Sequence, residues 1–311
     1  MATAQERTSR RDVAFPSGET TCSAWLYTPR AEEPIARIVM AHGLGGVRDM
    51  RLDAFAERFA SHGYECLLFD YRGFGMSGGR RRQILDVTAQ LADWEAAIAY
   101  LKDEGPPDRV VLFGTSLSGG HVLTLAARHS ELGAAIAQCP YTDGRASRAG
   151  LPFASKAKVT ARAALDLLTT PFGRRVDVAL IGAPGSAALM ATDDSARLLS
   201  LVPAGSAFEN RVAARSALWF LRYDPGRVAG DITIPLYVAI CQNDTVAPAE
   251  QTLRVARRIR DARIRVYPYH HFDIYIGEGF ESAVRDYLGF LDALFGGAAG
   301  AVGNGTGDAV D

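Results

Sequence analysis

Residues 110–120 have the sequence Val110-Val111-Leu112-Phe113-Gly114-Thr115-Ser116-Leu117-Ser118-Gly119-Gly120. An apolar run, a turn of small residues and a helix-like segment follow one another here, which is typical of a buried parallel strand that enters a helix. A serine in such a turn has a strained backbone that holds its hydroxyl above the carboxyl edge of the sheet. The segment therefore predicts an α/β fold with Ser116 as a nucleophile. A serine-rich helix N-cap is the alternative interpretation.

Short apolar runs alternate with longer amphipathic segments on both sides of this turn. Strands are expected at 37–41, 65–69, 110–113, 134–138, 235–240 and 264–267, and helices at 49–62, 84–102, 117–128, 249–260 and 280–295. Two shorter segments, 13–15 and 21–27, flank Ser17-Gly18 and predict an antiparallel hairpin. The pattern predicts a mostly parallel sheet with helices on both faces.

The alternation stops in the middle of the chain. Residues 140–230 contain helix-like pieces that are broken by proline and glycine, and the strand–helix pattern then resumes. We therefore expect an α/β core formed by 1–139 and 231–295, and a mainly helical cap formed by 140–230. The Gly/Ala-rich tail 296–311 has little to bury and is predicted to be disordered.

Charge and hydropathy restrict the kinds of molecule that this protein can bind. The chain has 34 Lys and Arg residues against 35 Asp and Glu, and its longest basic run, Arg80-Arg81-Arg82, is too short to follow a phosphate backbone. No stretch approaches the roughly 18 apolar residues of a membrane helix, and the polar segment Met1–Arg11 does not look like a signal peptide. We expect a cytoplasmic protein that binds neither nucleic acid nor a membrane. The four dispersed cysteines predict buried, reduced thiols.

Four further motifs lie in a meaningful order along the chain. They are His42-Gly43-Leu44-Gly45-Gly46, Asp70-Tyr71-Arg72-Gly73-Phe74-Gly75-Met76-Ser77, Cys241-Gln242-Asn243-Asp244-Thr245-Val246-Ala247-Pro248 and His270-His271-Phe272-Asp273. With these motifs, and with the order serine, acid, histidine, the sequence resembles the α/β-hydrolase superfamily over nearly its whole length. It departs from the strict G-x-S-x-G form at Ser118, where a second glycine is usual.

The resemblance implies a reaction and a role for each residue. Ser116 would attack a carbonyl carbon, His271 would accept the serine proton, and Asp244 would orient the imidazole. The backbone N–H groups of Leu44 and Leu117 would form the oxyanion hole. We therefore expect a serine hydrolase that needs no cofactor or metal. Its substrate would be a small molecule with a carboxylic ester, thioester or lactone, cleaved through an acyl-enzyme.

Several alternatives stay open at the level of sequence. His270 could replace His271 as the base, Asp143 could replace Asp244 as the acid, and His270, His271 and Asp273 could hold a metal. The spacing of Gly73, Gly75 and Gly78 matches a dinucleotide fingerprint, but a charged segment follows it instead of an apolar helix. The same triad could also serve peptide or carbon–carbon bond hydrolysis or acyl transfer, and the fold could carry a non-catalytic binding protein.

The cap contains apolar residues that invite two interpretations. They could line an acyl pocket, or they could pack the cap on itself, which is the more common fate at helical spacing. The residues are Leu165, Leu167, Leu168, Leu198, Leu199, Leu201, Trp219 and Phe220.

Overall fold

The computed structural model describes residues 8–31, 33–192 and 194–296. Within these ranges the main sheet has eight strands in the order β1-β2-β4-β3-β5-β6-β10-β11. Their bounds are β1 Thr8–Ser17, β2 Thr20–Pro29, β3 Arg37–Ala41, β4 Glu65–Phe69, β5 Val110–Thr115, β6 Ala134–Gln138, β10 Leu236–Cys241 and β11 Ala262–Tyr267.

The pairing of the strands confirms the expected mostly parallel sheet. β1 and β2 form the predicted antiparallel hairpin, and β2 pairs antiparallel with β4. Every other neighbouring pair in the main sheet is parallel, so β5 is enclosed between β3 and β6. All six residues of β5 are buried. The carboxyl ends of the parallel strands therefore lie along one edge, beside the loop that carries Ser116.

Helices cover both faces of this sheet. The core helices are α1 Leu52–Ser61, α2 Val87–Lys102, α3 Leu117–Ala126, α7 Ala249–Ala256 and α8 Gly277–Phe295. Helices α1 and α8 pack on each other through Phe55 and Phe280, whose ring centroids are 4.7 Å apart. Helices α2 and α3 are neighbours, because Gln90 Oε1 lies 3.0 Å from His121 Nε2.

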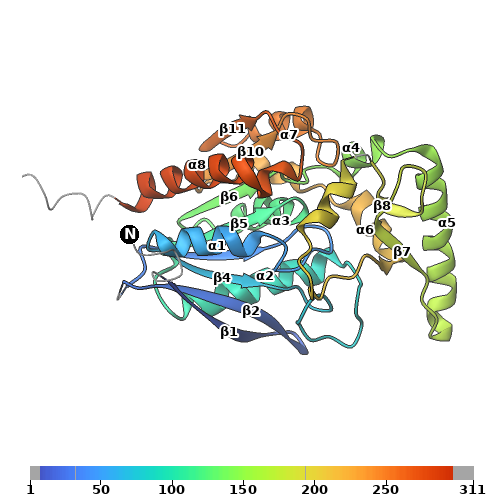
Figure 1. Ribbon diagram of the computed structural model, residues 1–311, viewed down its shortest axis with the longest axis horizontal. Coiled ribbons are helices and arrows are strands. Elements are labelled where there is room, and N and C mark those ends of the chain that lie inside the picture. The colour runs from blue at the N-terminus through green and yellow to red at the C-terminus, as the bar shows by residue number, and fades with distance from the viewer. Residues whose placement is uncertain (1–7, 32, 193, 297–311) are drawn as a thin grey trace, which may run out of the picture.

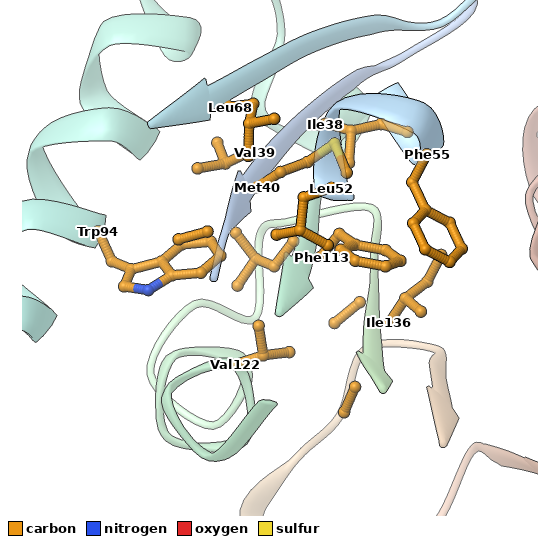
Figure 2. Close-up of a cluster of buried hydrophobic side chains, with 14 of the residues drawn as sticks. Ile38, Val39, Met40, Leu52, Phe55, Leu68, Trp94, Phe113, Val122 and Ile136 are labelled. Atoms are coloured by element: carbon orange, nitrogen blue, oxygen red, sulfur yellow. The ribbon is translucent and has the colours of Figure 1, made fainter. Parts of the chain in front are cut away.

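The hydrophobic core is divided by the sheet. Figure 2 shows Trp94 and Val122, from α2 and α3, on one side of the strands and Leu52 and Phe55, from α1, on the other. Phe113 of β5 contacts Phe55 with a centroid distance of 5.5 Å. Because both faces of the sheet are covered, its central strands are apolar throughout and show no alternation with polar residues.

The segment between β6 and β10 gathers at one end of the molecule (Figure 1). It contains α4 Gly144–Ala149, α5 Phe153–Thr169 and α6 Ala217–Arg222, together with the 3₁₀ helices η3 Thr170–Phe172, η4 Ser195–Leu201, η5 Ala214–Ser216 and η6 Pro225–Asp231. It also contains a small sheet in the order β8-β7-β9, with bounds β7 Asp177–Ile181, β8 Ala188–Met190 and β9 Val212–Ala213.

The sequence did not predict this small sheet, and it predicted helices where η4 and β9 lie. Two of these strands, β8 and β9, have only three and two residues, which is too short for an alternating pattern to show in the sequence. The division of the chain at residues 140 and 230 is kept as our proposal for the limits of the cap.

Two predictions concern the termini and the membrane. The predicted tail 296–311 lies outside the described residues except for Gly296. In the described ranges no helix is long and apolar enough to cross a membrane.

Glycines in the turn after β5 allow strand and helix to approach closely. A Cβ atom on Gly114 would lie 2.2 Å from the carbonyl oxygen of Ser118, whereas one on Gly289, in the middle of α8, would meet nothing within 4 Å. We expect Gly114→Ala to destabilise the fold by roughly 1–3 kcal/mol or more through overpacking. Gly289→Ala should stabilise it by about 0.5–1 kcal/mol, because alanine loses less backbone entropy in a helix. Urea unfolding of both variants measures these two changes in the free energy of unfolding. Equal stability of Gly114→Ala and the parent protein would contradict the prediction of overpacking.

Candidate active site

Ser116 lies between β5 and α3 in a strained conformation. Its φ is 57° and its ψ is −119°, so it has the positive φ that the sequence predicted for a nucleophile at this turn. The Ser116 N–H donates to the carbonyl oxygen of Gln138 at 2.8 Å, and the Ser116 carbonyl accepts from the N–H groups of Tyr141 and Gly120. The end of β6 thus holds the turn in place.

The loop after β3 approaches Ser116 directly. A Cβ atom on Gly43 would lie 2.7 Å from the Cβ of Ser116, so only glycine allows this approach. The next residue, Leu44, lines a cavity together with Ser116 and Leu117. Neither Leu44 nor Leu117 uses its N–H in a hydrogen bond to another described residue. Their amides are therefore free to serve as the predicted oxyanion donors.

His42 fixes the shape of this loop. Its Nδ1 accepts a hydrogen bond from the Gly43 N–H at 2.8 Å, which leaves Nε2 to donate to the Met50 carbonyl at 3.0 Å. The ring stacks on Tyr275 with a centroid distance of 5.7 Å. Burial lowers the pKa of His42 to about 4, so the ring is neutral near pH 7. The neutral ring thus holds the loop through both of its nitrogens.

Ser118, the departure from the usual motif, has specific partners. Its buried hydroxyl donates to the His42 carbonyl and contacts the hydroxyl of Tyr71. Tyr71 in turn accepts from the indole N–H of Trp94 at 2.6 Å. This chain of hydrogen bonds connects α2, the turn after β4, α3 and the His42 loop beneath Ser116. A glycine at 118 would remove the middle of the chain.

Asp244 and His271 form a buried pair. His271 Nδ1 and Asp244 Oδ2 are 2.5 Å apart, and their side chains are 0% and 1% exposed. The other oxygen of Asp244 accepts from the N–H groups of Val246 and Ala247 at 2.8 and 2.6 Å. The carboxylate is held on both oxygens, so it fixes the imidazole with Nδ1 protonated and Nε2 free of a proton.

The contact between Ser116 and His271 stays a prediction. His271 Nε2 is buried without a hydrogen-bond partner among the described residues, and the Ser116 hydroxyl forms no hydrogen bond within them. Catalytic hydrogen bonds are often long in a protein without substrate and tighten in the complex. The structure thus brings acid and base together and leaves the nitrogen that would accept the serine proton unoccupied.

The alternative acid and base have other surroundings. Asp143 caps the N-terminus of α4 by accepting from the Arg145 N–H at 2.7 Å. The His270 side chain is 40% exposed, and its Nδ1 lies 3.9 Å from Asp194 instead of contacting Asp244. The dinucleotide alternative also lacks its context, because the next helix after Gly78, α2, begins only at Val87.

A set of cap contacts to the catalytic loops was not found from the sequence. The Asp194 carboxylate, 3% exposed, accepts from the His271 backbone N–H at 3.3 Å. Arg197 lies 3.6 Å from Asp194 and 2.5 Å from Asp273, so it links the cap to the histidine loop. Thr245, next to Asp244, donates to Thr192 at 3.3 Å. No sequence pattern marks these residues, because the contacts to His271, Asp273 and Thr245 join segments that are far apart in the chain.

All four cysteines are buried and free, as the sequence predicted. Two of them, Cys139 and Cys241, lie with their sulfur atoms 3.3 Å apart below the acid–base pair. One potential ligand atom each of Cys139, Asp244 and His271 lie within 4.8 Å of one another. This is a different group from the His270, His271 and Asp273 set considered above. Because Asp244 and His271 already bond to each other, we assign no metal to it.

A partly enclosed cavity of about 150 Å³ opens at Ser116. The core contributes Leu44, Leu117 and Val246, which lie in loops at the carboxyl ends of β3, β5 and β10. The cap supplies most of the remaining lining, which is largely apolar: Leu151, Val159, Ala163, Ala188, Leu189, Met190, Ala217, Leu218 and Phe220. The cavity thus lies between core and cap, with the candidate nucleophile in its wall.

The apolar cap residues singled out in the sequence mostly do not reach this cavity. Of the eight, only Phe220 lines it. Helix α5 presents Ser155, Val159 and Ala163, at a spacing of four residues, and its leucines lie elsewhere. Leu165 and Leu168 are 49% and 70% exposed, and Leu198 and Leu201 are buried. Of the two interpretations, the lining of a pocket therefore holds for Phe220 alone among these eight residues.

Comparison with known proteins identifies the family. Residues 32–273 match the family described as serine aminopeptidase S33. The chain belongs to this family of α/β-hydrolases. That assignment confirms the superfamily and the fold class predicted from the motifs, and it places the chain in a family of hydrolases.

Relatives of this S33 family member extend over most of its length. The quorum-quenching protein AidA of Acinetobacter baumannii is 47% identical over 287 residues, which cover 91% of this chain and 94% of AidA. A thiohydrolase of Eupenicillium brefeldianum is 26% identical over 258 residues, with 79% and 82% covered. The crystal structure of the α/β-hydrolase GrgF from Penicillium sp. sh18 superposes with a TM-score of 0.80 at 23% identity, over 93% and 99% of the two chains.

The lowered pKa values of two buried histidines determine how the stability of the fold should depend on pH. Burial lowers the pKa of His42 to about 4 and that of His121 to about 3, below the ordinary value of 6.5. At pH values between the folded and unfolded pKa, the unfolded chain binds protons that the folded protein excludes. The free energy of unfolding is therefore highest above pH 6.5 and decreases as the pH falls. Each histidine should contribute a slope of up to about 1.4 kcal/mol per pH unit between pH 6 and 4. Urea unfolding at several pH values measures the slope.

A pair of histidine variants tests the origin of this slope. His121→Gln should reduce it by about one proton, whereas His62→Gln, which changes an exposed histidine, should leave it unchanged. An unaltered slope in His121→Gln would contradict the prediction.

Proposed function

We propose that this protein is a serine hydrolase that cleaves a carboxylic ester, thioester or lactone through an acyl-enzyme. The observation that carries the proposal is the buried contact of 2.5 Å between His271 Nδ1 and Asp244 Oδ2. It leaves Nε2 as the basic nitrogen of the site. Ser116 supplies the hydroxyl from a strained turn, in the wall of a cavity that can hold an acyl group.

Each residue has a defined part in the proposed reaction. The Ser116 oxygen forms a bond to the carbonyl carbon while its proton passes to His271 Nε2, and Asp244 stabilises the resulting imidazolium. The N–H groups of Leu44 and Leu117 donate to the oxyanion, and loss of one such donor typically costs about 2.7–4 kcal/mol of transition-state stabilisation. His271 then protonates the departing alcohol or thiol. Water, activated by the same nitrogen, releases the acid.

The chemistry of the cavity favours an acyl substrate over a peptide N-terminus. An aminopeptidase must accommodate a cationic α-ammonium group, for which a carboxylate is the matching partner. The charged side chains among the described lining residues are Arg148 and Lys156, both cationic. The remaining lining is apolar or hydroxylic. This environment suits an uncharged acyl chain, and it supports ester or thioester cleavage within a family that is described by a peptidase name.

The names of the relatives agree with this choice. The fungal relative is named a thiohydrolase, and AidA is named for quorum quenching. We therefore propose a small acyl compound as substrate. We place the reaction at the edge of the sheet where Ser116, Asp244 and His271 follow β5, β10 and β11.

Covalent labelling tests the nucleophile. A fluorophosphonate probe should label the parent protein and Ser147→Ala, a matched change in the same cavity wall, but not Ser116→Ala. Turnover of nitrophenyl esters should fall by on the order of 10⁶ in Ser116→Ala and about 10⁴ in Asp244→Asn. Absence of labelling in the folded parent protein would favour a non-catalytic binding protein. Faster cleavage of aminoacyl anilides than of esters would favour the peptidase alternative.

Asp194 offers a test of how the cap positions the base. Removing its carboxylate leaves the buried N–H of His271 without an acceptor, which should cost about 1–3 kcal/mol of stability. Small misplacement of a catalytic group can cost up to about 100-fold, so we expect kcat for a nitrophenyl ester to fall roughly 10- to 100-fold in Asp194→Ala with little change in KM. Asp194→Asn keeps an oxygen acceptor and should restore most of kcat. If Asp194→Ala and the parent protein have equal kcat, Asp194 does not position the base.

A further inference from the structure

Basic residues are concentrated in one part of the cap. Residues 144–165 contain no aspartate or glutamate, although the whole chain has 35 acidic residues against 34 basic ones. The basic residues of this segment are Arg145, Arg148, Lys156, Lys158 and Arg162. The excess of positive charge is therefore local to α4 and α5 and does not reflect a basic protein.

Two of these side chains lie at the mouth of the cavity. Arg148 and Lys156 line the cavity that holds Ser116, and both also line a surface hollow of about 350 Å³. Arg145 and Ala149 complete that hollow. Because the two spaces share Arg148 and Lys156, the hollow adjoins the cavity. A substrate that extended from the cavity into the hollow would pass these cations.

The cations at the mouth lack acidic partners. Within the described ranges no carboxylate lies within 4.0 Å of Arg145, Arg148 or Lys156, and the ammonium group of Lys156 donates only to the Ala149 carbonyl at 3.2 Å. Four other arginines of the cap, Arg175, Arg197, Arg211 and Arg215, do pair with carboxylates, as Arg215 does with the buried Asp166. Unpaired cations beside an otherwise apolar cavity create a site of positive potential that an anion can neutralise.

We infer that the substrate carries an anionic group, a phosphate or a carboxylate, on its leaving group, and that Arg148 and Lys156 bind this group. The inference rests on the proposed acyl-hydrolase function and specifies its substrate class. An apolar space of about 150 Å³ is comparable with an engineered protein cavity that binds benzene, so it fits a short acyl chain. The adjoining hollow takes the leaving group, with its charge against the guanidinium and ammonium groups.

Three thioesters separate the positions of the charge. Butanoyl-coenzyme A carries phosphates on the leaving group, S-butanoyl-N-acetylcysteamine is neutral, and S-succinyl-N-acetylcysteamine carries its carboxylate on the acyl side. In Arg148→Ala/Lys156→Ala we expect kcat/KM for butanoyl-coenzyme A to fall roughly tenfold, mainly through KM, because exposed ion pairs contribute up to a fewfold each. The loss for the neutral thioester should be several-fold smaller than the loss for butanoyl-coenzyme A. Raising the salt concentration should weaken the parent's preference for the coenzyme A thioester.

The same helix provides the matched control. Lys158 and Arg162 are exposed residues of α5 that line neither space, and they donate to the carbonyls of Gly185 and Asp177. Lys158→Ala/Arg162→Ala removes the same charge and should leave the preference intact. Calorimetry of free coenzyme A with Ser116→Ala gives a readout without turnover, and adding Arg148→Ala/Lys156→Ala should weaken that binding.

The outcomes are distinct. An equal loss for all three thioesters, or an equal effect of the control pair, would overturn the inference, as would a loss confined to the succinyl compound. If the parent protein cleaves the neutral thioester and Ser116→Ala does not, the proposed function stands whichever way the charge test falls. If none of the three thioesters is cleaved while coenzyme A still binds through Arg148 and Lys156, the proposed function fails and the anion site remains.

Discussion

The backbone at Ser116 is held at a positive φ that residues with a side chain seldom adopt, at a cost of about 1–3 kcal/mol. The surroundings maintain it. Both backbone polar groups of Ser116 are bonded, to Gln138 on one side and to Tyr141 and Gly120 on the other. A side chain on Gly119 would lie 2.8 Å from Pro140 Cα, so this approach also depends on glycine. The neighbouring strand thus fixes the strained turn and keeps Ser116 in the wall of the cavity.

This constraint explains why the oxyanion loop lies where it does. Gly43 packs against the Cβ of Ser116, and His42, bonded to the loop's own amide, prevents the loop from relaxing. The hydroxyl of Ser118 connects the first turn of α3 to the same loop through the His42 carbonyl. Helix, loop and turn therefore form one unit. Donors that are fixed before the substrate arrives need no reorganisation during the reaction, which is the main physical requirement for stabilising an oxyanion.

Much of this arrangement could be predicted from the sequence, and the limits have physical causes. The central strands β3, β4 and β6 were predicted with their observed bounds, because strands buried on both faces are continuous apolar runs. The sequence also singled out Asp244 and His271, which the structure places in contact, because each follows a strand in a recognisable motif. The partner of Ser118, by contrast, is a hydroxyl 47 residues away, and the role of Asp194 depends on a contact across 77 residues. Contacts between distant segments leave no periodic signal in a single chain.

The core and the cap have separate roles in the proposed reaction. In the proposed reaction the core supplies a nucleophile, an acid–base pair and two amide donors at one edge of the sheet, and these groups set the type of reaction. The proposed cap supplies most of the cavity lining, which is largely apolar but includes Arg148 and Lys156, so in the proposed function it selects substrates by size and charge. The Asp194 carboxylate also accepts from the backbone N–H of His271. In the proposed mechanism, a change in the cap that alters substrate choice can therefore also shift the base.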